Sequence, residues 1–154
     1  MSQVRDFDVV ILGGGMTGLT LAHHIASLNA AQPANQRQTL VVEAREAYLR
    51  DKTWCYWQHA NTPFDAAITH QWSQWSVSWD GKTQVSRARI PYVRVDSGRF
   101  YDIARREIDA SESVTLQLGE KAKSVSAGRT EVEIIGESDV WRANTVFDTR
   151  PAHL

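Results

Sequence analysis

The sequence predicts an α/β domain in which helices cover a parallel β-sheet, and three features near the N-terminus carry this prediction. An apolar run, residues 9–12, leads directly into Gly13-Gly14-Gly15-Met16-Thr17-Gly18, which has the pattern Gly-x-Gly-x-x-Gly. A helical pattern follows this loop, and a second apolar run, residues 39–42, ends in Glu43. A strand, a glycine-rich turn, a helix and a second strand in this order are typical of the Rossmann fold.

Length and composition suit one folded domain with no role in binding nucleic acid. The 154 residues are 42% hydrophobic and 23% charged, which is close to the globular average, so we expect a packed core. The net charge is −1 and no basic block occurs. No apolar run reaches the roughly 20 residues that span a bilayer, and no signal peptide precedes the first strand. The single cysteine, Cys55, fits a reducing compartment, so we predict a cytoplasmic protein and leave contact with a membrane surface open.

The first half of the chain yields a strand, a helix and a second strand. Residues 6–12 read as a strand and 16–30 as a helix, and a polar loop over 31–37 leads to a strand over 39–42. The helix has two apolar faces, which suit a helix between two layers. One face holds Leu19, Ala22, His23 and Ala26, and the other holds Leu21, Ile25 and Leu28.

The middle of the chain departs from simple alternation of strands and helices. Residues 44–69 contain Trp54-Cys55-Tyr56-Trp57 and follow no clear period. Residues 72–79 alternate tryptophan or valine with serine, which predicts a strand, and Asp80-Gly81 predicts a hairpin turn. A helix over 97–109 follows, with Asp96 or Ser97 as its N-cap, and then a strand over 114–118.

The last part of the chain predicts an antiparallel meander and a final strand. Three short strands, 122–125, 131–135 and 140–142, are separated by turns at Gly128 and Gly136. A last apolar run over 145–147 ends at Asp148.

The glycine-rich loop and Glu43 together predict a dinucleotide site. Gly13 permits a tight turn, Gly15 lets a pyrophosphate approach the backbone, and Gly18 lets the helix pack closely on the strand. The start of the helix offers N–H groups and a positive dipole end to phosphate. Glu43, 25 positions after Gly18, can accept hydrogen bonds from ribose hydroxyls. The alternative is a glycine-rich turn beside a solvated glutamate.

The order of the later elements resembles the FAD-binding domains of the glutathione-reductase and hydroxylase superfamily. NAD domains usually continue as alternating strands and helices, whereas a long tryptophan-rich segment follows the second strand here. This resemblance favours FAD over NAD.

Three further segments resemble the lycopene cyclase family of carotenoid biosynthesis. Residues 51–57, Asp-Lys-Thr-Trp-Cys-Tyr-Trp, look like the Thr-Trp-Ser/Cys-Phe-Trp segment of that family. Residues 92–100 resemble its Tyr-x-x-Val-x-Ser/Arg-x-x-Phe/Leu segment, and residues 147–151 its Asp-Ser/Ala-Arg-Pro/Gly segment. The matches occur in family order along the whole chain, and the Thr-Trp-Cys segment is the most specific of them.

The resemblance implies a flavoprotein that holds FAD without a covalent bond and acts on a small apolar substrate, a carotenoid polyene. Family members close the ends of lycopene into rings with no net redox change, while an acidic residue protonates the polyene. Ser97 lies where the superfamily often places a flavin-contacting polar residue, and Ala122 where a backbone contact to adenine is usual. The expected cofactor-contacting residues are Gly13, Gly14, Gly15, Met16, Thr17, Gly18, Glu43, Ala44, Thr53, Trp54, Ser97, Ala122 and Asp148.

The family is considerably longer than 154 residues. Its later Gly-Asp segment and its substrate region, with the protonating acid, have no counterpart here, so no catalytic residue is assigned. We therefore expect residues 1–154 to form an incomplete FAD-binding domain that does not cyclise lycopene alone. A flavin monooxygenase or isoprenoid reductase of the same superfamily, or an inactive nucleotide-binding module, are the alternatives. The oligomeric state is left open.

Other residues have plainer interpretations. His23 and His24 favour helix packing over metal binding, and Cys55 favours a small apolar role over a reactive thiol. Trp54 and Trp57 fit core packing and a polyene channel equally well. Two more expectations concern groups of side chains. One is packing of Trp72, Trp75 and Trp79 on the hairpin face. The other is an exposed ion-pair face on the helix, where Asp102 and Arg106 are four positions apart and the other charged residues are Arg99, Arg105 and Asp109.

Overall fold

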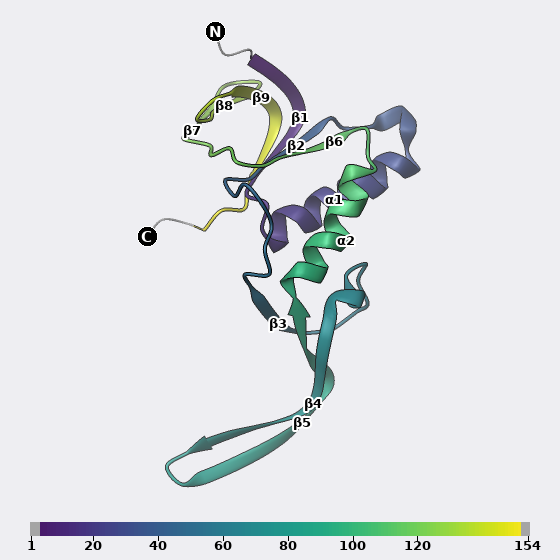
Figure 1. The fold of residues 1–154 in the computed structure, drawn as a ribbon, viewed down its shortest axis with the longest axis vertical. Coiled ribbons are helices and arrows are strands. Elements are labelled where there is room, and N and C mark those ends of the chain that lie inside the picture. Colours follow the sequence, from purple (N-terminus) through teal and green to yellow (C-terminus); the bar gives the residue numbers. More distant parts are fainter. Residues whose placement is uncertain (1–3, 152–154) are drawn as a thin grey trace. The chain divides into compact units, whose positions relative to one another are not determined.

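A computed structural model describes residues 4–151 of the protein. The described chain forms two compact units, one made of residues 4–48 and 104–151 and the other of residues 49–103. Helix α2 (Ser97–Asp109) contributes residues to both units. Each unit is built around its own β-sheet (Figure 1).

The first unit contains a six-stranded mixed sheet in the order β6-β2-β1-β9-β8-β7. Its strands are β1 (Val4–Leu12), β2 (Thr39–Val42), β6 (Val114–Gln117), β7 (Ser124–Ala127), β8 (Val132–Ile135) and β9 (Val140–Asp148). The neighbours β6, β2, β1 and β9 are parallel, whereas β7 and β8 are antiparallel to their neighbours. The structure therefore confirms the predicted α/β fold with a parallel sheet.

The continuous apolar runs of β1 and β2 are buried, as a strand covered on both faces requires. Val10, Ile11 and Leu12 are fully buried, and so are Leu40 and Val41. A hydrophobic core cluster joins these strands to the antiparallel end of the sheet. It contains Val10, Leu12, Leu40, Val42, Ala122, Ile134, Trp141 and Ala143.

Helix α1 (Met16–Ala31) buries only one of its two predicted apolar faces. Leu19, Ala22, His23 and Ala26 are buried, as expected. The second face is different, because Leu28 is 58% exposed and Leu21 and Ile25 are only half-buried. A short 3-10 helix, η1 (Pro33–Asn35), follows α1 and precedes β2.

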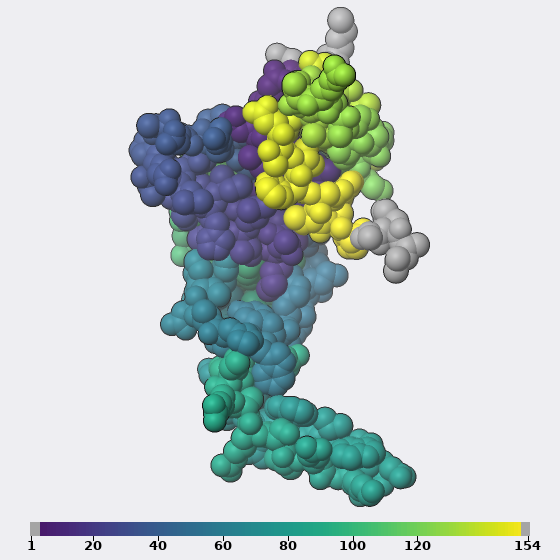
Figure 2. All heavy atoms as spheres, turned by 180° about the vertical axis from the view of Figure 1, so that it is seen from behind, coloured from purple at the N-terminus to yellow at the C-terminus, as the bar shows by residue number. Residues whose placement is uncertain are grey.

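The predicted meander is wrong in one respect, because its third strand and the final strand are one element. Residues 140–142 and 145–147 both belong to β9, which pairs antiparallel with β8 and parallel with β1. Ala143 and Asn144 break the apolar pattern in the sequence, but Ala143 is buried and the strand continues through it. The turns at Gly128 and Gly136 are as predicted, since their N–H groups donate to Glu131 and Asp139. Figure 2 shows β9 in yellow beside the green atoms of β7 and β8.

The second unit contains a three-stranded antiparallel sheet in the order β3-β5-β4. Its strands are β3 (Thr53–Trp57), β4 (Ile68–Trp79) and β5 (Lys82–Asp96), and a 3-10 helix, η2 (Asp65–Ala67), precedes β4. β3 lies in the stretch that the sequence pattern left unassigned. The Asp80-Gly81 hairpin turn is confirmed, with φ of 46° and 71° at its two residues.

Asp96 is the N-cap of helix α2. Its Oδ1 accepts a hydrogen bond of 3.1 Å from the backbone N–H of Arg99. This bond and the Arg50 guanidinium lower the pKa of the Asp96 carboxyl against the opposing effect of burial. The predicted ion-pair face of α2 contains an exposed pair between Arg105 and Asp109, which are four positions apart.

Within residues 4–151, no helix has both the length and the apolar character needed to cross a membrane. The same range contains no group of three or more histidine, cysteine, aspartate or glutamate side chains arranged to hold a metal ion. His23 is buried on α1, and burial lowers the pKa of its imidazole.

Candidate functional site: the glycine-rich loop and Glu43

The glycine-rich loop begins where β1 ends and leads into α1. The N–H of Gly13 donates to the carbonyl of Val42 at 2.9 Å, and Gly13 has a φ of 98°, which favours glycine. A Cβ on Gly18 would collide with the carbonyl oxygen of Gly13. The first turn of α1 can therefore approach the loop only because residue 18 has no side chain.

Gly15 lies at the open side of the loop. It is the N-cap of α1, and a Cβ placed on it would have nothing within 4 Å. No side chain caps the start of α1, and its first turn contains no acidic residue. The backbone N–H groups there remain available to an anion, which the helix dipole also favours.

Glu43 follows β2 and lies against the glycine-rich loop. Its Oε2 accepts a hydrogen bond of 2.6 Å from the backbone N–H of Gly14. Its Oε1 accepts bonds from the backbone N–H and the Nε of Arg45, at 2.9 Å and 3.0 Å. The residue is only 7% exposed, so the loop and the acid form one connected site.

The environment of Glu43 keeps its carboxyl ionised. Burial by itself raises the pKa of Glu43, but hydrogen bonds from Arg45 and Gly14 and the charge of Arg45 outweigh it. The net result is a pKa below the ordinary value of 4.5. An ionised carboxylate can accept hydrogen bonds from two ribose hydroxyls, and it repels a 2′-phosphate.

This lowered pKa predicts a loss of stability in acid. A carboxyl whose pKa is depressed by folding stabilises the protein above its unfolded pKa, and that contribution disappears as pH falls through the folded pKa. We expect the urea midpoint of unfolding to fall between about pH 5 and about pH 3, and to fall less in Glu43→Gln. An equal pH dependence in the two proteins would contradict this assignment.

Two side chains at this site, Arg45 and Tyr48, are absent from the residues predicted by sequence. The Tyr48 hydroxyl donates to the carbonyl of Gly14 at 2.8 Å, and Nη2 of Arg45 donates to the same oxygen at 3.0 Å. The Arg45 guanidinium also lies 4.8 Å from the centre of the Tyr48 ring. Arg45 could have been suspected because it lies two positions after the acid, whereas no sequence signal marks Tyr48.

The end of β9 also supports the loop. The Thr149 hydroxyl lies 3.0 Å from the carbonyl oxygens of both Leu12 and Gly13, and its backbone N–H donates to Leu12 at 2.9 Å. Thr149 therefore fixes the backbone at which the glycine-rich loop begins. The sequence places Thr149 in a segment that resembles the family, but it does not predict this structural role.

Arg150 connects two of the predicted cofactor-contacting residues, Asp148 and Ala122. Its Nε and Nη2 donate to the Asp148 carboxylate at 2.9 Å and 2.7 Å, and its Nη1 donates to the carbonyl of Ala122 at 2.9 Å. The hydrogen bond from Arg150 outweighs burial and lowers the pKa of the Asp148 carboxyl.

The predicted residues fall into two groups, one in each unit. The first unit holds Gly13, Gly14, Gly15, Met16, Thr17, Gly18, Glu43, Ala44, Ala122 and Asp148. The second unit holds Thr53, Trp54 and Ser97, where the Ser97 hydroxyl accepts a bond of 3.1 Å from the N–H of Lys52.

Trp54 has a packing role within the second unit. Its ring contacts Phe100 and Tyr101 edge-on, with ring centres 5.3 Å and 5.7 Å apart. These ring contacts support core packing as a role of Trp54. Cys55, the next residue, is exposed on β3 rather than packed as a small apolar side chain.

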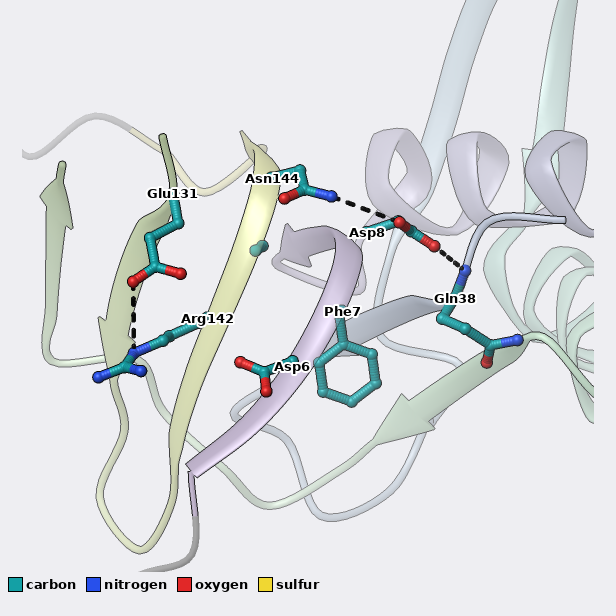
Figure 3. Close-up of a pocket in the computed structure, with 8 residues that line it drawn as sticks. Asp6, Phe7, Asp8, Gln38, Glu131, Arg142 and Asn144 are labelled. Carbon is teal, nitrogen blue, oxygen red and sulfur yellow. Dashed lines mark hydrogen bonds and ion pairs between the residues drawn. The ribbon is translucent and has the colours of Figure 1, made fainter. Parts of the chain in front are cut away.

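A cavity of about 360 Å³ lies at the other end of β1, away from the glycine-rich loop (Figure 3). Four of its polar side chains, Asp8, Asn144, Arg142 and Glu131, have partners within the cavity lining. Asp8 accepts from the backbone N–H of Gln38 at 2.8 Å and from Asn144 at 3.4 Å, and Arg142 pairs with Glu131 at 3.7 Å. These internal partners leave the loop and Glu43 as the better candidate site.

Comparison with known proteins identifies the family. Residues 8–154 match the family model described as "Lycopene cyclase protein". The chain belongs to the lycopene cyclase family. This result confirms the resemblance seen in the sequence segments. The comparison with curated proteins found no match.

Solved structures confirm the fold of this lycopene cyclase family member. The p-nitrophenol 4-monooxygenase PnpA of Pseudomonas putida is 12% identical with a TM-score of 0.76, and the match covers 96% of this chain and 42% of that one. PqsL of Pseudomonas aeruginosa, a probable FAD-dependent monooxygenase, is 15% identical with a TM-score of 0.67. The match covers 92% of this chain and 42% of PqsL.

A geranylgeranyl bacteriochlorophyll reductase-like protein of Thermoplasma acidophilum is 14% identical with a TM-score of 0.65. The match covers 95% of this chain and 39% of that protein. The chain thus spans well under half the length of these similar structures.

Proposed function

We propose that the first unit binds the adenosine diphosphate part of FAD. The observation that carries this proposal is the contact between the Glu43 carboxylate and the N–H of Gly14, directly beside the open start of α1. One site thus offers an acceptor for ribose and free backbone donors for a pyrophosphate. The open space above Gly15 supports the fit, because a phosphate needs close access to the backbone there.

The other predicted residues extend this proposal. Ser97 is proposed to contact the flavin and the backbone of Ala122 to contact the adenine, as the family resemblance implies. Thr53, Trp54 and Asp148 are proposed as further contacts to the cofactor. Met16, Thr17 and Ala44 complete the set through their positions next to the glycine-rich loop and Glu43. When bound, FAD supplies a reducible ring whose charge can stabilise a cation. The residues named here would hold the nucleotide.

The reaction we propose for the whole protein is ring closure of a carotenoid polyene with reduced flavin and no net electron transfer. Membership of the lycopene cyclase family supports this choice. A redox reaction is the second candidate, because the similar structures include a monooxygenase and a reductase-like protein. Consumption of NADPH coupled to substrate would favour that second candidate.

A titration of the purified chain with FAD, followed by flavin fluorescence, tests the cofactor. Saturable binding of FAD with much weaker binding of NAD is the expected result. Glu43→Gln should weaken FAD binding about tenfold, or ~1.4 kcal/mol, because the charged acceptor for the ribose hydroxyls is lost.

Glu131→Gln is the matched control, since Glu131 is half exposed, directly precedes β8 and lines the cavity at the end of β1 away from the loop. This variant should bind FAD as the original chain does. Binding of NAD but not FAD, or equal FAD affinity in both variants, would refute the proposed site.

A further inference from the structure

The carboxylate of Glu43, the proposed acceptor for ribose, is already engaged by four donors of the protein. Its Oε1 accepts from the backbone N–H and from Nε of Arg45, at 2.9 Å and 3.0 Å. Its Oε2 accepts from the backbone N–H of Gly14 at 2.6 Å and from Nη2 of Arg45 at 3.2 Å. Because a carboxylate has about four acceptor sites, a ribose hydroxyl can reach Glu43 only by displacing one of these donors.

The four donors differ in how easily they can leave the carboxylate. The backbone N–H of Gly14 belongs to the glycine-rich loop, and the backbone at Arg45 is held by a hydrogen bond of 2.9 Å from the N–H of Gly119 to the Arg45 carbonyl. The side chain of Arg45 is different, because it is 30% exposed and can turn into water without opening the core. The two bonds from the Arg45 guanidinium are therefore the ones that a ligand can replace.

Tyr48 holds the side chain of Arg45 against the loop. The centre of its ring lies 4.8 Å from the guanidinium, which is a cation–π contact. The Tyr48 hydroxyl and Nη2 of Arg45 both donate to the carbonyl of Gly14, at 2.8 Å and 3.0 Å. A Cβ placed on Gly14 would collide with the Tyr48 hydroxyl, so this side chain lies directly on the loop. We call the side chains of Arg45 and Tyr48 the latch.

Opening the latch opposes the binding of a nucleotide. Hydrogen bonds between a guanidinium and a carboxylate join two charged groups, whereas a ribose hydroxyl is a neutral donor and makes a weaker bond to the same oxygen. Replacing both Arg45 side-chain bonds by two hydroxyl bonds therefore returns only part of what is lost. A site that is closed for most of the time also binds its ligand more weakly, in proportion to the fraction of molecules in which it is open.

We propose that Arg45, held by Tyr48, is an autoinhibitory latch that closes over Glu43 in the free chain and opens when the two hydroxyls of a ribose replace its side-chain bonds. This inference rests on the proposed function, because the acceptor that the latch covers is the one assigned to ribose. Its consequence has an unusual sign. Arg45 is a cation beside a site for an anionic nucleotide, yet it opposes binding of that nucleotide.

Calorimetric titration of the full 154-residue chain with adenosine diphosphate, at about pH 8, tests the latch in Arg45→Met. Methionine keeps an unbranched side chain and removes the guanidinium donors. The variant should bind adenosine diphosphate about threefold more tightly or better, because two acceptor sites of Glu43 are then open. It should also unfold at a lower urea concentration, because the buried carboxylate loses its charged partner. A purely structural role of Arg45 would lower both stability and affinity, and a contact to phosphate would lower affinity.

Two controls separate the latch from a general effect of charge. Arg129→Met removes the same charge from an exposed position in the turn between β7 and β8, and it should bind adenosine diphosphate as the original chain does. The second control is a ligand, 2′,3′-dideoxyadenosine diphosphate, which offers no ribose hydroxyl. Arg45→Met should bind this ligand no more tightly than the original chain does, because nothing on it can use the open sites of Glu43.

Hydrogen exchange at the Nε–H of Arg45, followed by nitrogen-15 NMR, gives a second measurement that needs no altered chain. This group donates to Glu43 at 3.0 Å, so adenosine diphosphate should speed its exchange roughly tenfold when the latch opens. Equal or weaker binding of adenosine diphosphate by Arg45→Met, or slower exchange in its presence, overturns the latch and leaves the proposed site standing. Binding to neither chain refutes the proposed site, and the latch with it.

Discussion

Replacing Gly18 with alanine is expected to destabilise the protein by about 2–3 kcal/mol and to abolish measurable FAD binding. A Cβ at this position collides with the carbonyl oxygen of Gly13, which belongs to the backbone and cannot rotate away. Relief requires α1 to move away from the glycine-rich loop, which also separates the start of α1 from Gly14 and Glu43. Urea unfolding measures the first effect, and flavin fluorescence measures the second.

Gly15→Ala separates binding from stability. A Cβ on Gly15 has nothing within 4 Å, and its φ of −76° suits any residue, so the free energy of unfolding should change by no more than about 0.5 kcal/mol. FAD affinity should nevertheless fall about tenfold or more, because the added methyl group occupies space that a pyrophosphate needs. Normal FAD affinity in Gly15→Ala would place the phosphates elsewhere, and normal stability in Gly18→Ala would refute the tight packing of α1.

Replacing Trp141 with alanine is expected to cost about 3–5 kcal/mol of folding free energy. Trp141 lies on β9, is fully buried, and belongs to the cluster that joins the parallel and antiparallel parts of the sheet. Removing its indole leaves a cavity in this cluster, which the surrounding side chains fill only in part.

Trp79→Ala provides the comparison for the same chemical change at an exposed position. Trp79 is 50% exposed, so its loss should change the unfolding free energy by no more than about 0.5 kcal/mol. Chemical denaturation of both variants measures the difference. Similar effects of the two substitutions would show that the cluster around Trp141 does not hold the sheet together.

The features predicted correctly from sequence are those that local chemistry determines. The glycine spacing specifies a tight loop between β1 and α1, and the continuous apolar runs specify buried strands. Asp80-Gly81 supplies the positive φ values that a two-residue hairpin requires. The sequence does not decide between Asp96 and Ser97 as the N-cap of α2, because aspartate and serine cap helices about equally well.

The features missed from sequence depend on residues distant along the chain. The sequence pattern divides β9 in two because the burial of Ala143 comes from β1 and β8, which local periodicity does not show. Tyr48 and Thr149 contribute to the site through hydrogen bonds to carbonyl groups of the loop, and any backbone carbonyl can accept such a bond. Nothing in the neighbouring sequence indicates which carbonyl is chosen.

The position of β9 in the sheet also determines the order in which the first unit can be assembled during synthesis. β1 is made first, but one of its edges is covered only by β9, after residues 13–139 have been added. At roughly 5–20 residues per second, that edge stays unpaired for about 6–25 seconds as the chain grows. An apolar strand with an open edge pairs readily with other chains. The nascent protein therefore passes through a period of vulnerability to aggregation, and chaperone binding during translation should be concentrated on β1.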